Sequence, residues 1–224
     1  MQRRRLILGV LALPAWRAAA GASAPVSFAP VLAGRRLSFP ADHGAHPDFR
    51  TEWWYVTGWL SLPNGVPLGF QTTFFRVRTG VGEDSPSAFA PRQLILAHAA
   101  IADPRLKRLR HDERSARAGF GRAGFETGRS GVWVGDWRFT QAGDAYRAEV
   151  KAADFAYALD CVPDGPPLLN GLAGFSAKAA DPRHASHYYS RPQLRVSGTV
   201  TLDGRQEAVT GRAWLDHEWS SEVM

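Results

Sequence analysis

Two short segments of the chain place carboxylates next to large aromatic rings, a combination suited to acid chemistry on an apolar molecule. In one of them, Asp216-His217-Glu218 lies between Trp214 and Trp219. In the other, Glu52 is followed directly by Trp53-Trp54-Tyr55. A carboxyl group buried among apolar side chains gains proton affinity and can act as a general acid near neutral pH. These two segments are therefore the first candidates for a catalytic site.

The reaction that these residue types suggest is the addition of water to a carbon–carbon double bond. It needs an acid that protonates carbon, surroundings that tolerate a carbocation, and a positioned water molecule. We expect Asp216 to be the proton donor, with Glu218 and His217 setting its protonation and placing the water. Glu52 is the second carboxylate candidate. The rings of Trp53-Trp54-Tyr55 would line the path of the cation and stabilise it by cation–π attraction.

A structural interpretation of the same carboxylates is also open. On an extended strand Asp216 and Glu218 share a face, while His217 points the other way. The two carboxylates could then form ion pairs that fix the last strand of the domain. The candidate partners for these ion pairs are Arg50, Arg191 and Arg212.

Other kinds of catalytic site find little support in the sequence. The seven histidines show none of the usual close metal-ligand spacings, so we expect no metal site, and we expect no other cofactor. No Gly-x-Ser-x-Gly elbow occurs, and Cys161 stands in no activating context, which disfavours serine and thiol hydrolases. The histidines that follow the signal-like N-terminus are His43, His46, His98, His111, His184, His187 and His217.

The elements that would position these side chains are short β-strands. Alternating runs of aromatic and β-branched residues are separated by turn residues, and Asn64-Gly65 and Asp203-Gly204 are typical of tight hairpin turns. No stretch after the N-terminus has a convincing helical period. The expected strands span residues 53–60, 68–77, 93–101, 131–139, 146–151, 155–161, 186–190, 194–202 and 206–215, and the expected loops span residues 79–92, 103–130 and 162–185.

So many short strands indicate an all-β fold, an antiparallel barrel or a sandwich. A closed barrel is favoured because it leaves no exposed sheet edge. One face of the second strand would carry Leu68, Phe70, Thr72 and Phe74 toward the interior. These side chains, and the aromatic rings among them in particular, would either fill the core or line a space for one small apolar ligand.

The N-terminus has the order of an export signal. Arg3-Arg4-Arg5 precedes an apolar run to Trp16 and a small-residue stretch from Ala18 to Ala24, so we expect residues 1–24 to be a cleaved signal peptide of the Sec or twin-arginine type. The mature protein would be periplasmic or secreted, without a stable membrane span. Its formal charge falls from +6 to +2 because four arginines leave with the signal, which argues against nucleic-acid binding.

Four blocks of the sequence resemble the AttH and carotenoid 1,2-hydratase family of lipocalin-like proteins, and they look closer to the AttH branch. The first and last blocks are long and unusual in composition, so chance is a poor explanation for them. The blocks cover His46 to Gly58, Ala97 to Asp103, Tyr188 to Arg191, and Gly211 to Ser220.

The resemblance implies a lipocalin-like barrel, the first of two consecutive barrels in a family member. We therefore expect the barrel over residues 25–213 and the start of a connection to a second barrel over residues 214–224. The expected function is binding of a lipid or isoprenoid in association with an envelope ABC transporter. The alternatives are a cofactor-independent hydratase, which is a lyase, and a structural half of a barrel pair. The ligand-binding candidates are Trp53, Trp54, Tyr55, Phe70, Phe74, His98, Tyr188 and Trp214.

Overall fold

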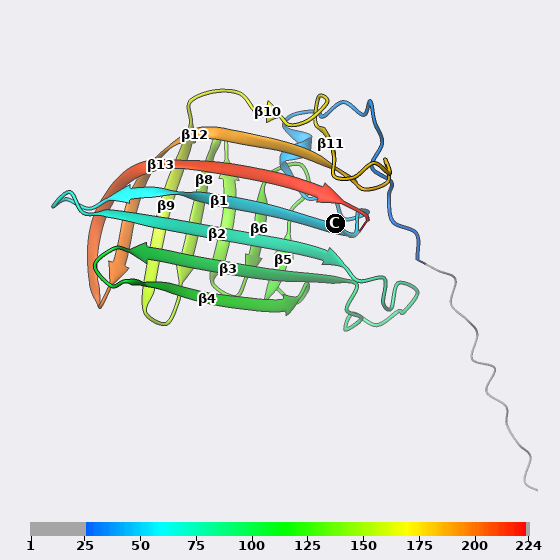
Figure 1. Ribbon diagram of the computed structural model, residues 1–224. Helices are drawn as coiled ribbons and strands as arrows, with labels where there is room; N and C mark the ends of the chain where they lie inside the picture. The colour runs from blue at the N-terminus through cyan, green and yellow to red at the C-terminus, as the bar shows by residue number, and fades with distance from the viewer. Residues whose placement is uncertain (1–25, 223–224) are drawn as a thin grey trace, which may run out of the picture.

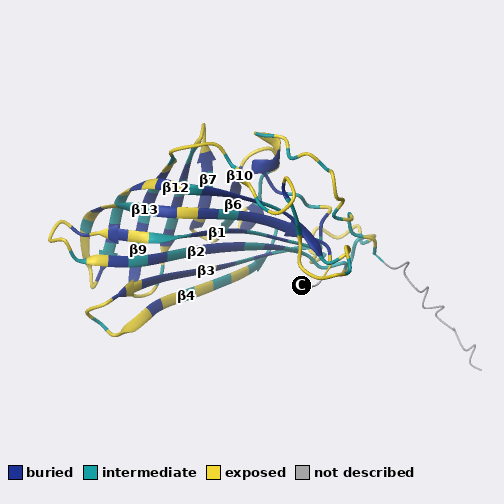
Figure 2. Ribbon diagram, turned by 45° about the horizontal axis from the view of Figure 1, so that its top comes forward, coloured by how far each residue is buried: buried dark blue, intermediate teal, exposed yellow. Residues whose placement is uncertain are grey.

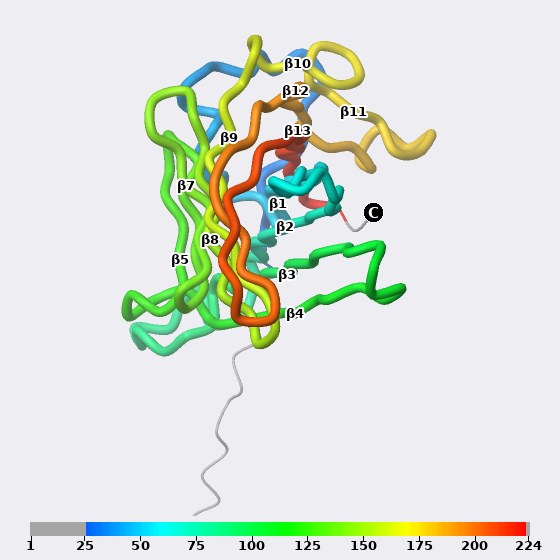
Figure 3. The backbone as a smooth tube through the Cα atoms, turned by 90° about the vertical axis from the view of Figure 1, so that its left-hand side faces the viewer, coloured from blue at the N-terminus to red at the C-terminus, as the bar shows by residue number. Residues whose placement is uncertain are grey.

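The computed structural model describes residues 26–222, and it is an antiparallel, nearly closed β-barrel. The expected signal peptide lies outside the described residues. Eleven strands follow one another around the barrel in the order β4-β3-β2-β1-β13-β12-β9-β8-β7-β6-β5, and β10 and β11 pair with β12 outside this path. The all-β fold class predicted from the sequence is thereby confirmed. Figure 3 views the barrel nearly end on, with β1 to β4 on one side and β5 to β9 on the other.

One wall of the barrel is a meander of four strands, each paired with the next along the chain (Figure 1). The Asn64-Gly65 turn closes the first hairpin, as predicted, because Ser61 and Pro67 are its last paired residues. These strands are β1 (Thr51–Ser61), β2 (Pro67–Arg78), β3 (Gln93–Asp103) and β4 (Arg108–Arg117).

The other wall is built from five shorter strands that also pair in chain order. They are β5 (Ala123–Phe125), β6 (Gly131–Val134), β7 (Trp137–Ala142), β8 (Ala145–Lys151) and β9 (Phe155–Pro163). Between the two ends of the strand order, the bridge Gly119–Ala123 brings the chain after β4 against β5.

Two long strands join the walls. β12 (Ala185–Leu202) pairs with β9, and β13 (Arg205–Ser220) pairs with both β12 and β1. The Asp203-Gly204 turn connects them in the predicted hairpin. β13 continues to Ser220, so residues 214–220, which we had assigned to a connection, are part of the last barrel strand.

The interior is filled by side chains that alternate along the strands. In β1 the inward positions Trp54, Val56 and Leu60 are buried, whereas the outward positions between them are at least partly exposed. The core continues across the barrel through residues such as Phe74 and Trp137. The core-filling interpretation of the aromatic residues therefore holds for much of the barrel interior.

One end of the barrel is covered by segments that precede β1 and β12. Residues 26–50 cross this end and contain the short 3-10 helix η1 (Ala41–His43), and β10 (Leu168–Leu169) and β11 (Phe175–Ala177) lie beside it along β12 (Figure 1). A second small core forms there from Phe49, Tyr189 and Trp219. No helix among residues 26–222 is long and apolar enough to span a membrane.

The structure corrects the expected loop at residues 103–130, which contains β4 and β5. The expected strand at 131–139 is two strands, β6 and β7, joined at Gly135 and Asp136. The two expected strands at 186–190 and 194–202 are one continuous strand, β12, with a register shift between Arg191 and Leu194.

Candidate active site

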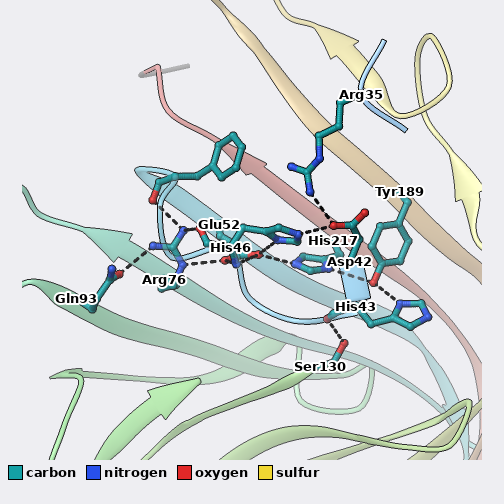
Figure 4. Close-up of polar contacts among 11 residues, drawn as sticks. Arg35, Asp42, His43, His46, Glu52, Arg76, Gln93, Ser130, Tyr189 and His217 are labelled. Carbon is teal, nitrogen blue, oxygen red and sulfur yellow. Dashed lines mark hydrogen bonds and ion pairs between the residues drawn. The ribbon is translucent and has the colours of Figure 1, made fainter. Parts of the chain in front are cut away.

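A cluster of ionisable side chains occupies the covered end of the barrel (Figure 4). The barrel wall supplies Glu52 from β1, Arg76 from β2 and His217 from β13, all of which point inward and are completely buried. Inward alternation places them there, because Glu52 lies two residues before Trp54 and His217 two residues after Leu215. The covering segment adds further members of the cluster from residues 35–46.

Glu52 is the centre of this cluster and has every oxygen occupied. Its Oε1 atom accepts hydrogen bonds from His46 Nδ1 at 2.7 Å and from His217 Nε2 at 2.9 Å. Its Oε2 atom accepts from Arg76 Nε at 2.8 Å and from the backbone N–H of His46 at 2.9 Å. Burial favours the neutral carboxyl, but the hydrogen bonds from His217 and His46 and the charges of His46 and Arg76 hold the pKa of Glu52 well below its usual range. Glu52 is therefore an anion in the folded protein.

His46 links this anion to a second carboxylate. Its Nε2 atom lies 3.0 Å from Asp42 Oδ1, which also accepts from Arg35 at 2.8 Å. Burial alone would lower the pKa of His46, but the hydrogen bonds to Asp42 and Glu52 and their negative charges raise it above its usual value. Because each ring nitrogen of His46 faces a carboxylate oxygen, which only accepts, the geometry favours the doubly protonated imidazolium.

The pKa of His217 is shifted in the opposite direction, although its ring binds the same oxygen of Glu52 as His46 does. Its complete burial lowers its pKa despite the hydrogen bond and charge of Glu52, so the ring is neutral at neutral pH. Because Nε2 donates to Glu52, Nδ1 carries the lone pair and lies 3.1 Å from the hydroxyl of Tyr189. The result is a buried carboxylate–imidazole–hydroxyl series, the arrangement in which a carboxylate orients an imidazole to take up a proton.

Tyr189 connects this series to a third histidine. Its hydroxyl also lies 2.9 Å from Nδ1 of His43 in η1. Burial, together with the charge of Arg191, lowers the pKa of His43 to about 4. Burial also raises the pKa of Tyr189 well above its usual value, so the phenol stays protonated. A proton on the Tyr189 oxygen thus lies between two neutral imidazoles.

Aromatic rings enclose the cluster and leave several polar atoms without partners. Trp219 stacks on His46 with 3.7 Å between ring centroids, and Trp54 stacks on His217 at 4.7 Å. Among the described residues, neither indole N–H of these two tryptophans has a hydrogen-bond partner, and neither ring nitrogen of buried His187 has one. Unpaired polar groups are rare in protein interiors, so these atoms are unusual features of the covered end.

The same residues could be considered as metal ligands. His46, Glu52 and His217 each offer one ligand atom, and these atoms lie within 4.8 Å of one another. In a tetrahedral zinc site with bonds of about 2.0–2.1 Å, ligand atoms are roughly 3.3 Å apart. The 2.7 and 2.9 Å separations here are shorter, and Arg76 holds the other oxygen of Glu52. The distances fit hydrogen bonds better than metal ligation.

The structure separates the predicted catalytic residues into two groups. Glu52 and His217 meet inside the barrel, whereas Asp216 and Glu218 point to the outside of β13. Asp216 accepts hydrogen bonds from Tyr188 at 2.9 Å and from Trp214 Nε1 at 2.7 Å, and also from Ser190. Asp216 and Glu218 thus share one face of β13 and His217 lies on the other, as strand alternation predicts, so His217 is not placed to set the protonation of Asp216 by direct contact.

The predicted arginine partners of these carboxylates also differ from those observed. Glu218 pairs with Lys178 at 2.6 Å and is hydrogen bonded by Ser186. Arg191 instead pairs with Asp144, and Arg212 with Asp164. Residues 164–184 fold over this part of the outer face, which explains why Glu218 is buried although it points outward.

The predicted ligand-binding residues divide in the same way. Trp54, Phe70 and Phe74 point into the barrel and are buried in its core. The other five lie on outward positions of β1, β3, β12 and β13, where alternation keeps them out of the interior. These five are Trp53, Tyr55, His98, Tyr188 and Trp214.

Several members of the cluster were missed as site residues in the sequence. Arg76 and Tyr189 sit on strands at inward positions, where a polar residue in an otherwise apolar alternation was the available signal. His43 and His46 lie in a loop before the first strand, so no periodicity pointed to them. Their contribution depends on the covering segment folding back over the barrel.

The sequence and the fold are similar to those of known proteins. A family model described as AttH-like matches residues 30–224. A crystal structure of an AttH-type protein from Nitrosomonas europaea is similar at 48% identity and a TM-score of 0.80, with 88% of this chain and 59% of that chain covered. Kievitone hydratase from Nectria haematococca is similar in fold, at 10% identity and a TM-score of 0.63, with 89% of this chain and 56% of that chain covered.

The chain thus spans somewhat less than three fifths of the length of each of these two structures. A search of curated proteins gave no match to the sequence.

Proposed function

The chain belongs to the AttH-like family, and we propose that it is a hydratase-type enzyme acting on a double bond of an apolar substrate. The observation that carries this proposal is the buried series Glu52–His217–Tyr189, in which an ionised carboxylate orients a neutral imidazole toward a hydroxyl. A buried ionic network is costly to the fold, and residues whose pKa values are shifted by such networks are frequent in active sites.

Water addition needs one group that donates a proton and one that accepts a proton. His46 and His217 bind the same oxygen of Glu52, but the pKa of His46 is raised and that of His217 is lowered. Neighbouring groups whose pKa values are pushed apart are a general sign of an acid and a base. We therefore assign His46 as the acid that gives its proton to one carbon of the double bond and His217 as the base. Water adds to the other carbon, its proton passes to the Tyr189 oxygen, and Tyr189 passes its own proton to His217. Return of a proton from His217 to His46, which bind the same oxygen of Glu52, restores the protein.

The aromatic rings beside the cluster fit the other requirement of the reaction. A cation that develops on the substrate would be stabilised by the rings of Trp54 and Trp219, which lie against His217 and His46. Because Glu52 is ionised, it would act through its charge rather than as the acid expected from the sequence. The Asp216 assignment, on the outer face, is the competing proposal.

The experiment compares two conservative variants in hydration assays with a panel of acyclic isoprenoids. Tyr189→Phe keeps the ring and removes the hydroxyl, and we expect turnover to fall about 100-fold or more, the range for loss of general acid–base catalysis. Asp216→Asn should retain most of the activity. Loss of activity only in Asp216→Asn would move the site to the outer face of β13. A wild-type chain that binds the isoprenoids but does not hydrate them would instead support a function in lipid or isoprenoid binding.

We also propose, from the N-terminal sequence, that the protein is exported and works with an envelope ABC transporter. The order of basic, apolar and small residues over positions 1–24 supports export. The transporter partnership is proposed from the resemblance to the AttH family alone. Mass spectrometry of the protein recovered from a periplasmic fraction would test export, since a mature N-terminus near residue 25 is expected. Co-purification with a transporter subunit after mild crosslinking would test the partnership, and recovery of the unprocessed chain from the cytoplasm would contradict both.

A further inference from the structure

A hollow on the outer surface of the barrel lies away from the acid–base cluster, beside the hairpin turns of β1–β2 and β3–β4. Figure 1 shows these two turns at the end of the barrel opposite the covering segments. We propose that this groove binds a single-chain amphiphile with an anionic head group, such as a fatty acid. The proposal is independent of the hydratase function, because no member of the acid–base cluster lines the groove.

Strand register builds the groove. Trp59, Gly69, Ala102 and Leu109 are direct cross-strand neighbours in one row on the outer face of β1, β2, β3 and β4. The two middle residues are the smallest in the row, and the two outer residues are large. A Cβ atom added at Gly69 would lie 3.2 Å from the Cβ atom of Ala102, so the floor is low and closely packed. The row therefore forms a channel with two apolar walls.

The size and lining of the channel fit an alkyl chain. The hollow between Trp59 and Leu109 has a volume of about 550 Å³, within the range of about 300–1,000 Å³ for small-molecule sites. A second hollow of about 220 Å³ shares Gly69, Ala102 and Leu109 and extends along the strands over Gln71 and Ala100. The two hollows together form an elongated groove, which suits a single chain better than a compact ring system.

The two apolar side chains that form the walls of the groove are largely exposed to solvent, so a bound ligand would remove apolar surface from water. Trp59 is 59% exposed and Leu109 is 52% exposed, although both are large apolar side chains. Covering such surface is favourable by about 25 cal/mol for each Å² removed from water. An alkyl chain lying on Gly69 and Ala102 would contact both walls at once.

The charge at the turn end of the groove selects the head group. Asp103 lines the groove, but Arg105 binds both of its oxygens and neutralises it. Lys107 and Arg108 also line the groove; within the described part of the chain Lys107 has no ion-pair partner, and the nearest carboxylate to Arg108 is Asp154 at 3.8 Å. The groove therefore carries positive charge at one end and apolar surface along its length, which is complementary to an anionic amphiphile.

The test uses dodecanoate below its micelle concentration, titrated into the full chain by calorimetry. Ala102→Phe fills the floor of the groove at an exposed position, and Ser115→Phe is its matched control, since it adds the same ring on exposed β4 outside the groove. The double variant Lys107→Glu/Arg108→Glu reverses the head-group charge. Arg138→Glu, an exposed position on β7, reverses one charge outside the groove and is the control for the single variants Lys107→Glu and Arg108→Glu, which are measured beside the double variant. Circular dichroism checks that each variant is folded.

We expect dodecanoate to bind wild type, Ser115→Phe, Arg138→Glu and Tyr189→Phe alike. Ala102→Phe and the double charge reversal should each weaken binding about tenfold or more, and the charge reversal should favour dodecyltrimethylammonium instead. Equal binding by Ala102→Phe, or equal affinity of wild type for the cationic probe, would overturn the proposal. Binding to anionic vesicles without binding of the monomer, or dimerisation that Ala102→Phe abolishes, would also overturn it in favour of a membrane or a second copy.

Discussion

At the scale of single residues, the charges of the acid–base cluster are costly to bury, and each charged group is paired with one of opposite charge. The cluster consists of Arg35, Asp42, His43, His46, Glu52, Arg76, Tyr189 and His217. Glu52 and Arg76 form an ion pair at 2.8 Å in which both side chains are completely buried. Arg76 also donates to the carbonyl oxygens of His46 and Phe49, so it ties the covering segment to the barrel. Removal of one charge of such a pair leaves the other without compensation. The cluster, which we propose as the acid–base site, is thus also a fixed point of the fold.

Glu52→Gln should destabilise the protein strongly. Loss of the carboxylate leaves buried Arg76 unpaired, and we expect a decrease of about 3–5 kcal/mol in the free energy of unfolding measured in urea. The double variant Glu52→Gln/Arg76→Met removes both charges and should recover part of that loss. If the double variant is less stable than the sum of the two single effects predicts, the ion pair is not the main contribution of Glu52.

His187 offers a pH-dependent prediction. Its ring is buried against Phe49 and Trp219, and burial lowers its pKa to about 4 from the usual 6.5. Between these two pH values the unfolded chain binds more protons than the folded protein, so stability falls as the pH decreases, by at most about 1.4 kcal/mol per pH unit for this group. His187→Phe removes the titration and the two unpaired nitrogens.

We therefore expect His187→Phe to increase the melting temperature, and to increase it more at pH 5 than at pH 8. Thermal unfolding at the two pH values measures this difference. An equal shift at both pH values would show that His187 does not contribute to acid sensitivity, and a decrease at both would show that its ring nitrogens have partners in solution.

At the scale of elements, the sequence predicts strands well where one face is apolar. β1 and β2 alternate clearly, and their turn chemistry is diagnostic, so both were expected with nearly correct bounds. β4 was missed because its sequence, RLRHDERSAR, is polar on both faces. Its inward residue Arg110 is buried yet pairs with Asp203 of the distant β12–β13 turn, an arrangement that no local pattern reveals.

The prediction of the site was also limited by what local sequence patterns reveal. Alternation correctly separated His217 from Asp216 and Glu218, but the pattern does not say which face is inside the barrel. The two tryptophans that favoured Asp216 lie on opposite faces of β13: Trp214 is on the outer face with Asp216, whereas Trp219 points into the covered end of the barrel. The contributions of His43 and His46 depend on a loop crossing the barrel end, which is set by tertiary packing.

Two glycines of β13 and its turn should respond very differently to alanine. Gly204 has a φ angle of +76° with open space around it, so Gly204→Ala should cost about 1–2 kcal/mol from backbone strain alone. A Cβ atom at Gly211 would lie 2.0 Å from the carbonyl oxygen of Trp59, so Gly211→Ala should force β1 and β13 apart and cost about 3 kcal/mol. Urea unfolding compares the two, and equal costs would contradict the close strand contact.

At the scale of the whole molecule, the two ends of the barrel differ in character. Figure 2 shows buried stretches of β12 and β13 where the covering segments lie over them, and exposed turns at the other end. The covered end contains the ionic cluster, while the far end carries the amphiphile groove on its outer wall. A ligand bound in the groove would therefore act on the protein through its rigid strands rather than by contact with the cluster.

The segment that covers β12 also exposes apolar surface. Leu168 and Leu172 lie in residues 164–184, which fold beside β12, and they are 49% and 76% exposed. Trp214 on the neighbouring β13 is 37% exposed. Trp219, by contrast, is buried in the barrel end. Exposed apolar residues in one region are typical of interaction surfaces.

This surface leads us to expect weak self-association of the chain at high concentration. Burial of Leu168, Leu172 and Trp214 between two copies would remove apolar area from water, at about 25 cal/mol per Å². Sedimentation velocity over a concentration series should show a concentration-dependent increase in the sedimentation coefficient that mild detergent abolishes. Leu168→Ser/Leu172→Ser should suppress the association without loss of fold, because both side chains are exposed, whereas Leu109→Ser, at the separate groove, should leave it intact. Association that persists in the double leucine variant but disappears in Leu109→Ser would place the contact between copies at the amphiphile groove instead.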